Sequence, residues 1–201
     1  MTVVLGGTFD PVHMGHLHAA CVAADILDAS VLMVLSARPV HRDAPVASVD
    51  DRWRMLRTAC ADFERLVPSD IELLRKGPSY AADTLVFLNG SHRDPVIWVL
   101  GADAFDSVHT WHRFDEFANR CSFLVFTRPG SLSNRLPSGF KSVNDLSVLT
   151  RSSGIVYFGE QAMKKISATK LRQDLAQGCA DENSVPSGVW EYLHRRGLYL
   201  T

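Results

Sequence analysis

The chain has 201 residues, of which 46% are hydrophobic and 21% charged, with a formal net charge of -1. This length and composition predict a single globular domain, residues 1–201, that buries a full hydrophobic core. The near-neutral charge argues against a nucleic-acid polymer as the main partner, because proteins that bind such polymers usually present strongly basic surfaces. Small anionic ligands remain compatible with it, since a few local cations suffice to bind them.

No apolar stretch is long enough to span a bilayer, and the first residues lead into a glycine-containing loop instead of a signal peptide. The four cysteines, Cys21, Cys60, Cys121 and Cys179, are far apart and include no C-x-x-C pair. Such spacing is typical of reduced, mostly buried thiols. We therefore expect a cytoplasmic protein that does not act at a membrane.

Short apolar runs alternate with helical patterns along the chain. The runs predict six strands: Thr2–Gly6, Val31–Ser36, Asp70–Leu74, Val96–Gly101, Ser122–Thr127 and Ile155–Phe158. Strands that alternate with crossover helices indicate an α/β protein, a single Rossmann-like, doubly wound domain with a mostly parallel sheet. Ligands of such sheets bind at the carboxyl ends of the strands, so the loops after Gly6, Leu35 and Leu100 should share one rim.

Capping residues and apolar periodicity predict the helices. Ser48–Asp51 resembles a capping box, and Ser79 is expected to cap the following helix. The predicted helices are Gly15–Asp28, one from Ser48 to about Phe63, one from Ser79 to about Leu88, Phe114–Asn119, Thr169–Gln177 and Val189–Arg195. The segment Gly130–Ser153 is rich in Ser, Asn, Pro and Gly, and we expect it to be a loop or a surface insertion.

The eleven residues Gly6–His16 (GGTFDPVHMGH) lie between the first predicted strand and the first predicted helix. Gly6 and Gly7 allow the backbone to approach a ligand, and unpaired N–H groups at the start of the helix favour anions. His13 and His16 are three residues apart on one face of the first turn, and each can become a cation. The arrangement predicts a phosphate site. It lacks both the third glycine of a G-x-G-x-x-G dinucleotide loop and the G-K-[ST] ending of a P-loop.

A second group of polar side chains opens the predicted helix after Ile166. Ser167, Thr169, Lys170 and Arg172 follow one another within six residues. Free N–H groups, hydroxyls and cations at one helix terminus can bind a polyphosphate. Considered alone, the same residues also fit an ordinary N-cap at Ser167 followed by a basic surface helix.

Gly6–His16 resembles the H-x-G-H motif of the nucleotidyltransferase superfamily, and the full stretch resembles its nicotinate mononucleotide adenylyltransferase family. Ile166–Arg172 resembles the superfamily's I-S-[ST]-x-x-[RI] signature, with Ala168 where many members have serine. The resemblance implies a nucleotidyltransferase fold and catalytic roles for His13 and His16. It assigns ATP binding to Gly6, Gly7, Thr8, Phe9, Gly101, Asp103, Ile166, Ser167, Thr169 and Arg172.

Four further elements follow the family's order along the chain. Arg38–Arg42 is similar to a phosphate-binding Pro-His-Lys/Arg element, and Gly77–Leu85 is similar to a G-P-S-Y-T…T-L element. Gly101–Asp103 is similar to a G-x-D element that binds ribose. Thr110–His112 is similar to an element with a Thr-Trp pair, whose tryptophan stacks on nicotinate. Together with an arginine after the fifth predicted strand, the resemblance assigns mononucleotide binding to His41, Arg42, Ser79, Tyr80, Ala81, Trp111, His112 and Arg128.

Each of these elements also has a structural interpretation. Arg38–Arg42 would suit a solvated basic loop, Asp103 an N-cap, and Trp111 a core or rim aromatic. Ala81 departs from the family's threonine, so a hydroxyl contact is lost there while a backbone N–H contact survives.

Members of the family transfer AMP from ATP to nicotinate mononucleotide, giving nicotinate adenine dinucleotide and pyrophosphate in NAD biosynthesis. The resemblance implies in-line attack by the mononucleotide's 5′-phosphate on the α-phosphorus of ATP, with no covalent intermediate and no general base. His16 is the expected α-phosphate contact, with His13 assisting. Mg²⁺ is expected to arrive with ATP, held by phosphates and water instead of a cage of protein ligands.

Other functions remain as alternatives. The nearest is the same chemistry on nicotinamide mononucleotide or phosphopantetheine. A metal-binding module would use His13, His16 and His18, but His18 lies off the shared helical face and no carboxylate or thiol lies at ligand spacing. A nucleotide-binding regulator without catalysis is disfavoured by the intact histidines, Thr169 and Arg172. The sequence does not distinguish a monomer from a homo-oligomer.

Overall fold

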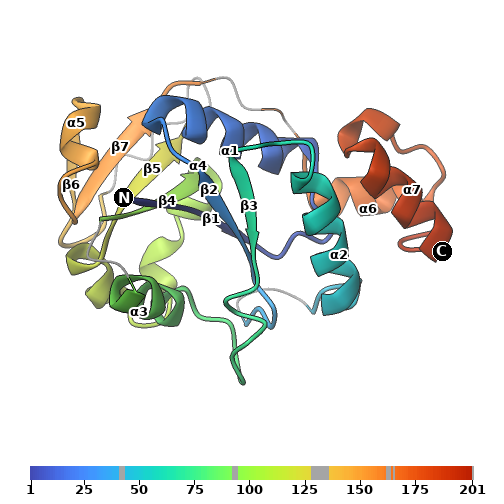
Figure 1. The fold of residues 1–201 in the computed structure, drawn as a ribbon, viewed down its shortest axis with the longest axis horizontal. Coiled ribbons are helices and arrows are strands. Elements are labelled where there is room, and N and C mark those ends of the chain that lie inside the picture. Colours follow the sequence, from blue (N-terminus) through green and yellow to red (C-terminus); the bar gives the residue numbers. More distant parts are fainter. Residues whose placement is uncertain (41–43, 92–94, 128–135, 162–163, 165, 201) are drawn as a thin grey trace.

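The computed structural model describes residues 1–40, 44–91, 95–127, 136–161, 164 and 166–200. Its strands form one sheet in the order β3-β2-β1-β4-β5-β7-β6, in which all neighbouring strands run parallel (Figure 1). The strands are β1 (Thr2–Gly7), β2 (Val31–Leu35), β3 (Leu66–Ser69), β4 (Val96–Gly101), β5 (Cys121–Phe126), β6 (Lys141–Val143) and β7 (Ile155–Gly159). The strand order reverses at β1, which lies between β2 and β4, and this confirms the predicted doubly wound fold.

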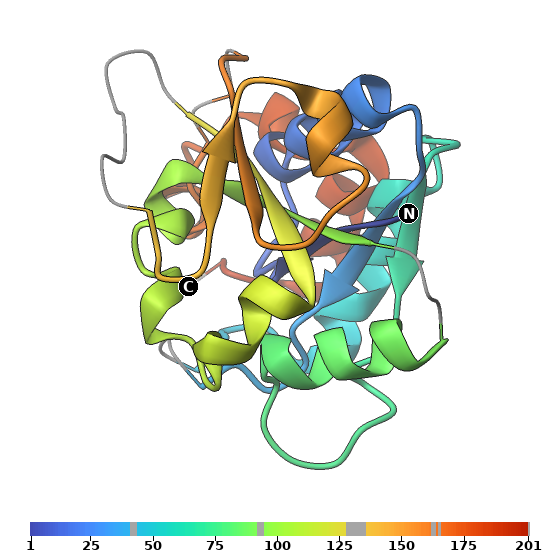
Figure 2. The same ribbon diagram turned by 90° about the vertical axis from the view of Figure 1, so that its left-hand side faces the viewer.

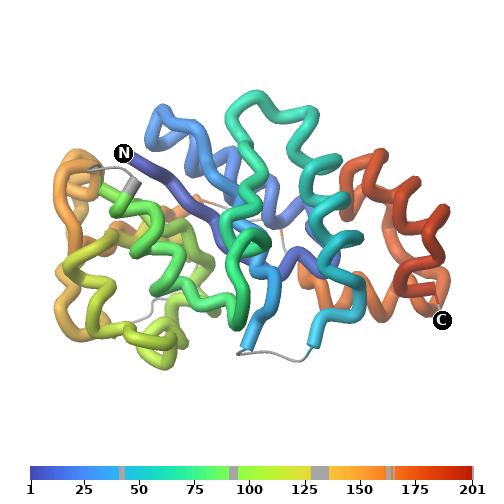
Figure 3. Tube along the Cα trace, turned by 60° about the horizontal axis from the view of Figure 1, so that its bottom comes forward, coloured from blue at the N-terminus to red at the C-terminus, as the bar shows by residue number. Residues whose placement is uncertain are grey.

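Helices cover both faces of the sheet (Figure 2). One face packs against α1 (Met14–Leu27), α2 (Val49–Cys60), α5 (Leu146–Leu149), α6 (Ala168–Ala176) and α7 (Ser187–Arg196). The other packs against α3 (Ala81–Ser91), α4 (Ala102–Phe105) and the 3₁₀ helices Val108–Thr110 and Phe114–Asn119. A third 3₁₀ helix, Glu182–Ser184, links α6 and α7, which lie beside α2 at the end of the molecule opposite β6 (Figures 1 and 3).

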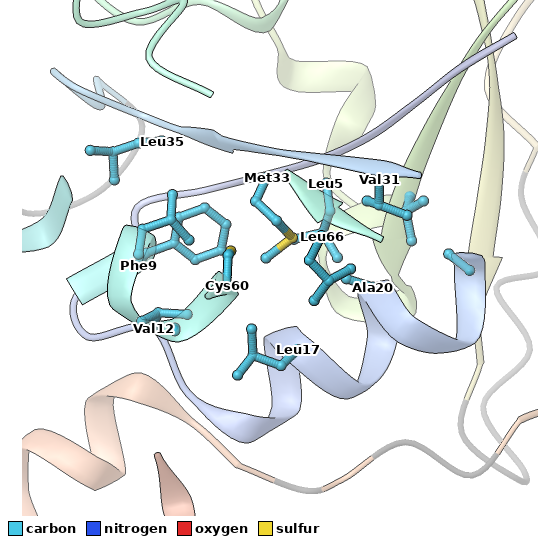
Figure 4. Packing of buried hydrophobic residues seen from close by; sticks show 14 of the residues in the cluster. Leu5, Phe9, Val12, Leu17, Ala20, Val31, Met33, Leu35, Cys60 and Leu66 are labelled. Atoms are coloured by element: carbon cyan, nitrogen blue, oxygen red, sulfur yellow. The ribbon is translucent and has the colours of Figure 1, made fainter. Parts of the chain in front are cut away.

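Alternating side chains of the strands divide the core into two clusters. In β4, Ile97 and Val99 belong to the cluster under α1 and α2, whereas Trp98 and Leu100 belong to the cluster under α3. Figure 4 shows the first cluster, in which strand side chains such as Met33 face the apolar side of α1. Both faces of the central strands are buried, as expected for a parallel sheet between two helical layers.

The strand predicted at Asp70–Leu74 is wrong. The structure has β3 at Leu66–Ser69, just before it, and Leu73 and Leu74 instead donate turn hydrogen bonds to the carbonyl of Asp70. The sequence obscured this strand because Pro68 lies within it, and proline is normally unfavourable in a strand. β3 tolerates the proline because it is an edge strand.

The segment Gly130–Ser153 is not a plain loop. Within its described part, Lys141–Val143 forms the edge strand β6 and Leu146–Leu149 forms helix α5. A strand of three residues, two of them polar, is too short to show the alternation on which strand prediction depends.

The other predicted elements are present with shifted ends. Helix α2 stops at Cys60 instead of near Phe63, α3 begins at Ala81 instead of Ser79, and Phe114–Asn119 is a 3₁₀ helix. No helix in the described ranges is long and apolar enough to cross a membrane.

Candidate active site

The junction between β1 and α1 lies at the carboxyl edge of the sheet, where the strand order reverses. The next strand joins the same rim, because the Ser36 amide donates to the Gly7 carbonyl at 2.8 Å. Gly7 has a packing reason beyond ligand approach: a Cβ atom there would lie 2.8 Å from the ring of Phe9. The ring of Phe9 is buried in the core and in turn contacts the edge of the His16 ring, at 5.0 Å between centroids.

His13 and His16 hold each other in place. The amide of each residue donates to Nδ1 of the other at 3.3 Å, a reciprocal capping arrangement in which His13 is the N-cap of α1. Their rings stack at 3.7 Å between centroids and 16° between planes. Because Nδ1 accepts a hydrogen bond, the proton of each neutral ring lies on Nε2. Each ring therefore carries its Nε2–H in a fixed orientation.

His13 is not a cation near neutral pH, contrary to the expectation from the sequence. It is buried, and burial lowers its pKa from the usual 6.5 to about 4. A neutral imidazole can still donate one hydrogen bond to a phosphate, so the lowered pKa of His13 is compatible with a role as a hydrogen-bond donor.

The burial of His13 predicts a loss of stability in acid. The unfolded chain binds the proton at a higher pH than the folded chain, so stability is full above about pH 6.5 and declines as the pH falls to 4. Between pH 7 and pH 4, the parent chain should lose about 3 kcal/mol more unfolding free energy than His13→Gln. Urea unfolding at each pH measures this difference. Parallel pH profiles for the two proteins would show that His13 can be protonated in the fold without cost.

A buried arginine, which sequence analysis did not single out, holds the loops of this rim together. Arg52 is only 2% exposed, and its guanidinium donates to the carbonyls of Thr8, Ser36 and Ala37 at 2.8–2.9 Å. Its Nε also donates to the carbonyl of Ala47 at 3.3 Å. The position could have been recognised, because Arg52 lies one helical turn before Leu56 on the apolar face of α2.

A second residue that sequence analysis did not single out is Asp10. Its carboxylate is buried and accepts hydrogen bonds from the amides of Val46 and Ala47 at 2.8 and 3.0 Å, and from the hydroxyl of Tyr199 at 2.6 Å. Asp10 lies inside the Gly6–His16 stretch, and Tyr199 follows helix α7 near the carboxyl end of the chain. The segment before α2 and the carboxyl-terminal segment are thus attached to the junction.

The structure brings the two phosphate-binding candidates together. Arg172 of α6 donates from Nη1 to the backbone carbonyl of Asp10 at 2.7 Å, a link across 162 positions of the chain. Ser167 is the N-cap of α6, but its side chain makes no capping hydrogen bond, and Ser167 and Thr169 are both exposed. Ile166, half-buried, precedes them. Helix α6 therefore presents exposed hydroxyls at its start and a guanidinium bonded to the loop that leads into the histidine pair.

The candidates for the mononucleotide pocket also meet. The Ser79 hydroxyl accepts from the amide of Arg38 at 3.0 Å, and the Ser79 amide donates to the Arg38 carbonyl at 2.9 Å. Ser79 thus joins two loops instead of acting as the predicted helix cap. Ala81 begins α3, where the first N–H groups of a helix have no partner within the helix. His41, Arg42 and Arg128 lie outside the described residues.

Aromatic side chains line the same region. The rings of Tyr80 and His112 lie 4.2 Å apart, which joins the Gly77–Leu85 and Thr110–His112 elements. Trp111 is half-buried and meets the rings of Trp98 and Phe117 edge-on at 6.0 and 5.8 Å. Trp111 therefore belongs to the rim of the core, which is the structural alternative considered for it, and its partial exposure keeps one side open to a ligand.

Gly101 and Asp103 follow β4 on the same rim. Gly101 is the N-cap of α4, and Asp103 is an exposed residue of the helix's first turn. The interpretation of Asp103 as the N-cap is therefore wrong. An exposed carboxylate next to the switch point can accept hydrogen bonds from ribose hydroxyls.

The three histidines do not form a metal centre. In the described ranges, no three His, Cys, Asp or Glu side chains gather in a way that could hold a metal ion. A hollow of about 710 Å³ lies elsewhere, between α2 and α7, and includes none of the candidate site residues in its lining.

The fold defines a nucleotide-binding protein of the Rossmann-like class, in which the histidine pair lies at the switch point of a parallel sheet. The chain belongs to the cytidylyltransferase-like family, whose model matches residues 4–174.

Relatives with a described activity cover nearly the whole chain. A protein described as a probable nicotinate-nucleotide adenylyltransferase of Pseudomonas syringae pv. tomato is 39% identical over 204 residues, which cover 98% of this chain and 92% of that protein. A protein of Pseudomonas fluorescens with the same description is 40% identical over 206 residues, with 98% and 95% covered.

The fold is also shared with a solved structure. A Plasmodium falciparum nicotinic acid mononucleotide adenylyltransferase, solved in complex with NaAD, has a TM-score of 0.74 at 17% identity, with 98% and 96% of the two chains covered. At this identity the comparison supports the nucleotidyltransferase fold alone.

Proposed function

We propose that the protein transfers AMP from ATP to nicotinate mononucleotide, giving nicotinate adenine dinucleotide and pyrophosphate in NAD biosynthesis. The observation that carries the proposal is the link between Arg172 and Asp10, which joins two phosphate-binding elements at the switch point of the sheet. The descriptions of the Pseudomonas relatives support the choice of acceptor.

In the proposed reaction, an oxygen of the mononucleotide's 5′-phosphate forms a bond to the α-phosphorus of ATP. The bond from that phosphorus to the bridging oxygen breaks in line, and the electron pair leaves with pyrophosphate. An ionised phosphate is already nucleophilic at neutral pH, so the protein needs no general base. Its task is to position two polyanions and to stabilise the charge that develops, which are the dominant contributions in phosphoryl-type transfers.

The residues divide this task between them. The Nε2–H groups of His16 and His13 donate to the α-phosphate, and the backbone of Gly6–Phe9 approaches it from the end of β1. Ser167, Thr169 and Arg172, with the backbone at Ile166, bind the β- and γ-phosphates that leave. The remaining ATP residues, Gly101 and Asp103, bind ribose.

The mononucleotide binds on the opposite side of the junction. Trp111 stacks on the nicotinate ring, His112 and Tyr80 flank it, and the Ala81 amide donates a hydrogen bond from the start of α3. Ser79 supports this pocket through its hydrogen bonds to Arg38. By the family resemblance, His41 and Arg42 bind the 5′-phosphate of the mononucleotide, and Arg128 also binds the mononucleotide.

Mg²⁺ is expected to enter with ATP, because the carboxylate of Asp10 in the junction is buried and already accepts three hydrogen bonds, whereas a magnesium cage requires available carboxylates. When bound, the ion neutralises charge on the phosphate oxygens of ATP. We place the reaction in the cytoplasm. The four cysteines are free thiols, two buried, Cys21 partly buried and Cys179 exposed.

Replacement of Trp111 by alanine tests its stacking on nicotinate and its packing in the core by two different measurements. We expect the KM for nicotinate mononucleotide to rise about fivefold to a hundredfold, because stacking on an aromatic base contributes about 1–3 kcal/mol. The KM for ATP should stay within about twofold. The melting temperature should also fall, since the ring packs against Trp98 and Phe117. A lower melting temperature with an unchanged KM would leave Trp111 with a packing role only.

The acceptor is tested by measuring pyrophosphate release from Mg·ATP with nicotinate mononucleotide, nicotinamide mononucleotide and phosphopantetheine in parallel. The proposal predicts the highest kcat/KM with nicotinate mononucleotide. Release with phosphopantetheine alone, or faster release with the amide than with the acid, would contradict it.

A further inference from the structure

We propose that Tyr199 and Asp10 are positioning residues for ATP: their hydrogen bond keeps the Arg172 guanidinium directed toward the phosphates. The inference rests on the proposed function only in that ATP binds at the start of α6. It assigns a role in the active site to a residue two positions from the end of the chain, far in sequence from either motif.

The first step is the way in which the Asp10 carboxylate is used. Its Oδ1 accepts from the Tyr199 hydroxyl at 2.6 Å and from the Ala47 amide, and its Oδ2 accepts from the Val46 amide. Asp10 is only 5% exposed. These three donors fix the carboxylate plane, and a buried carboxylate that is bonded in this way has little freedom to turn toward another partner.

The second step concerns Arg172, which lies close to that carboxylate without a hydrogen bond to it. Nη1 of Arg172 donates to the backbone carbonyl of Asp10 at 2.7 Å, whereas its distance to Oδ2 is 3.8 Å. Among the described residues, Arg172 makes no other side-chain hydrogen bond. A guanidinium has five donors in a rigid fork, so the remaining donors can bind phosphate oxygens in a paired geometry.

The third step is the competition that follows if the tyrosine hydroxyl is removed. Oδ1 would then keep only the Ala47 amide as a donor in a buried site, and the less constrained carboxylate could turn to accept from the nearby guanidinium as well. A carboxylate that pairs with Arg172 competes directly with phosphate for the same donors. The tyrosine therefore keeps a neighbouring anion from occupying the arginine.

Two features of Tyr199 support this specific role. Its side chain is buried, and burial together with the Asp10 bond raises the pKa of Tyr199, so it remains a donor at any physiological pH. Its backbone has φ of 62°, in the left-handed region that non-glycine residues rarely adopt. Such a conformation persists only where the surroundings over-determine the position.

The test compares two tyrosine-to-phenylalanine variants near the carboxyl end. Tyr199→Phe removes the bond to Asp10, and Tyr192→Phe removes a matched bond of 2.8 Å from a tyrosine of α7 to Asp51, away from the site. Calorimetric titration with Mg·ATP, in the absence of an acceptor, measures affinity directly. We expect Tyr199→Phe to bind ATP about five- to twentyfold more weakly, and Tyr192→Phe to stay within about twofold of the parent chain.

Two further measurements distinguish positioning from general loosening. The KM for the mononucleotide should stay within about twofold in Tyr199→Phe while the KM for ATP rises. In an Arg172→Ala background, adding Tyr199→Phe should weaken ATP binding no further, because the residue through which it acts is gone. Melting curves of all variants establish that each is folded.

Equal ATP affinity in Tyr199→Phe and Tyr192→Phe, equal rises in both KM values, or additive effects with Arg172→Ala would each overturn the inference. If the parent chain binds no ATP, the inference fails as well. A different outcome, in which ATP affinity behaves as expected but pyrophosphate is released only with another acceptor, would refute the proposed function and leave this inference standing.

Discussion

Replacement of His16 by alanine is expected to lower kcat by about 10²–10³, the usual cost of removing one donor aimed at developing charge in a transition state. The ring of His16 is oriented by Phe9 and by its stack on His13, which fixes the direction of its Nε2–H in the first turn of α1. The KM values should change much less than kcat, because the proposed contact is strongest at the pentavalent α-phosphorus. Steady-state pyrophosphate release measures the loss.

His18→Ala is the matched control, since it removes a histidine from the same helix α1 at a half-buried position outside the proposed site. It should keep kcat within about threefold of the parent chain. His16→Ala also loses the acceptor of the His13 amide, so a loss of about 1 kcal/mol in stability is expected. A folded His16→Ala protein with near-normal kcat would remove His16 from the mechanism.

Arg52→Leu is expected to lower the free energy of unfolding by about 3–5 kcal/mol, the largest stability effect that we predict. Leucine keeps the apolar contacts of the side chain's stem but leaves the carbonyls of Thr8, Ser36, Ala37 and Ala47 without the donors that they now have. Each buried acceptor without a partner costs about 1–3 kcal/mol, and the loops can relax only in part. Urea unfolding gives the value.

The control for this change is Arg54→Leu, two positions further along α2. Arg54 is exposed, so its replacement should alter stability by less than about 0.5 kcal/mol. Because Arg52 holds Thr8 beside Gly7 and Phe9, any folded fraction of Arg52→Leu should also show reduced kcat. If the two leucine variants unfolded at the same urea concentration, the guanidinium of Arg52 would contribute nothing to the loops of the rim.

The sequence predicted the features that depend on local order along the chain. The motif Gly6–His16 was placed correctly because a glycine-rich turn, a capping residue and a helix follow one another within a few residues. The parallel sheet and its rim follow from the alternation of strands and helices, and they brought the Gly6 loop, Ser36 and Gly101 to one edge as expected.

Long-range contacts between polar groups could not be predicted in this way. The bonds of Asp10 to Tyr199 and Arg172 join positions 189 and 162 residues apart, and no spacing rule connects them. Serine suits an N-cap, so the sequence favours a cap at Ser79, but the Ser79 hydroxyl accepts a hydrogen bond from the Arg38 amide instead. The sequence allows His13 to become a cation because it does not reveal burial, which lowers the pKa of His13 and keeps the ring neutral near pH 7.

The most direct test is a crystal structure of the protein with Mg²⁺, a non-hydrolysable ATP analogue and nicotinate mononucleotide. The account predicts that the α-phosphorus lies beside the Gly6–Phe9 backbone, with Nε2 of His16 in hydrogen-bond contact and Arg172 on the outer phosphates. It also predicts nicotinate on the exposed side of Trp111. A triphosphate bound elsewhere, for example among Arg54, Arg57 and Arg195 in the hollow between α2 and α7, would contradict it.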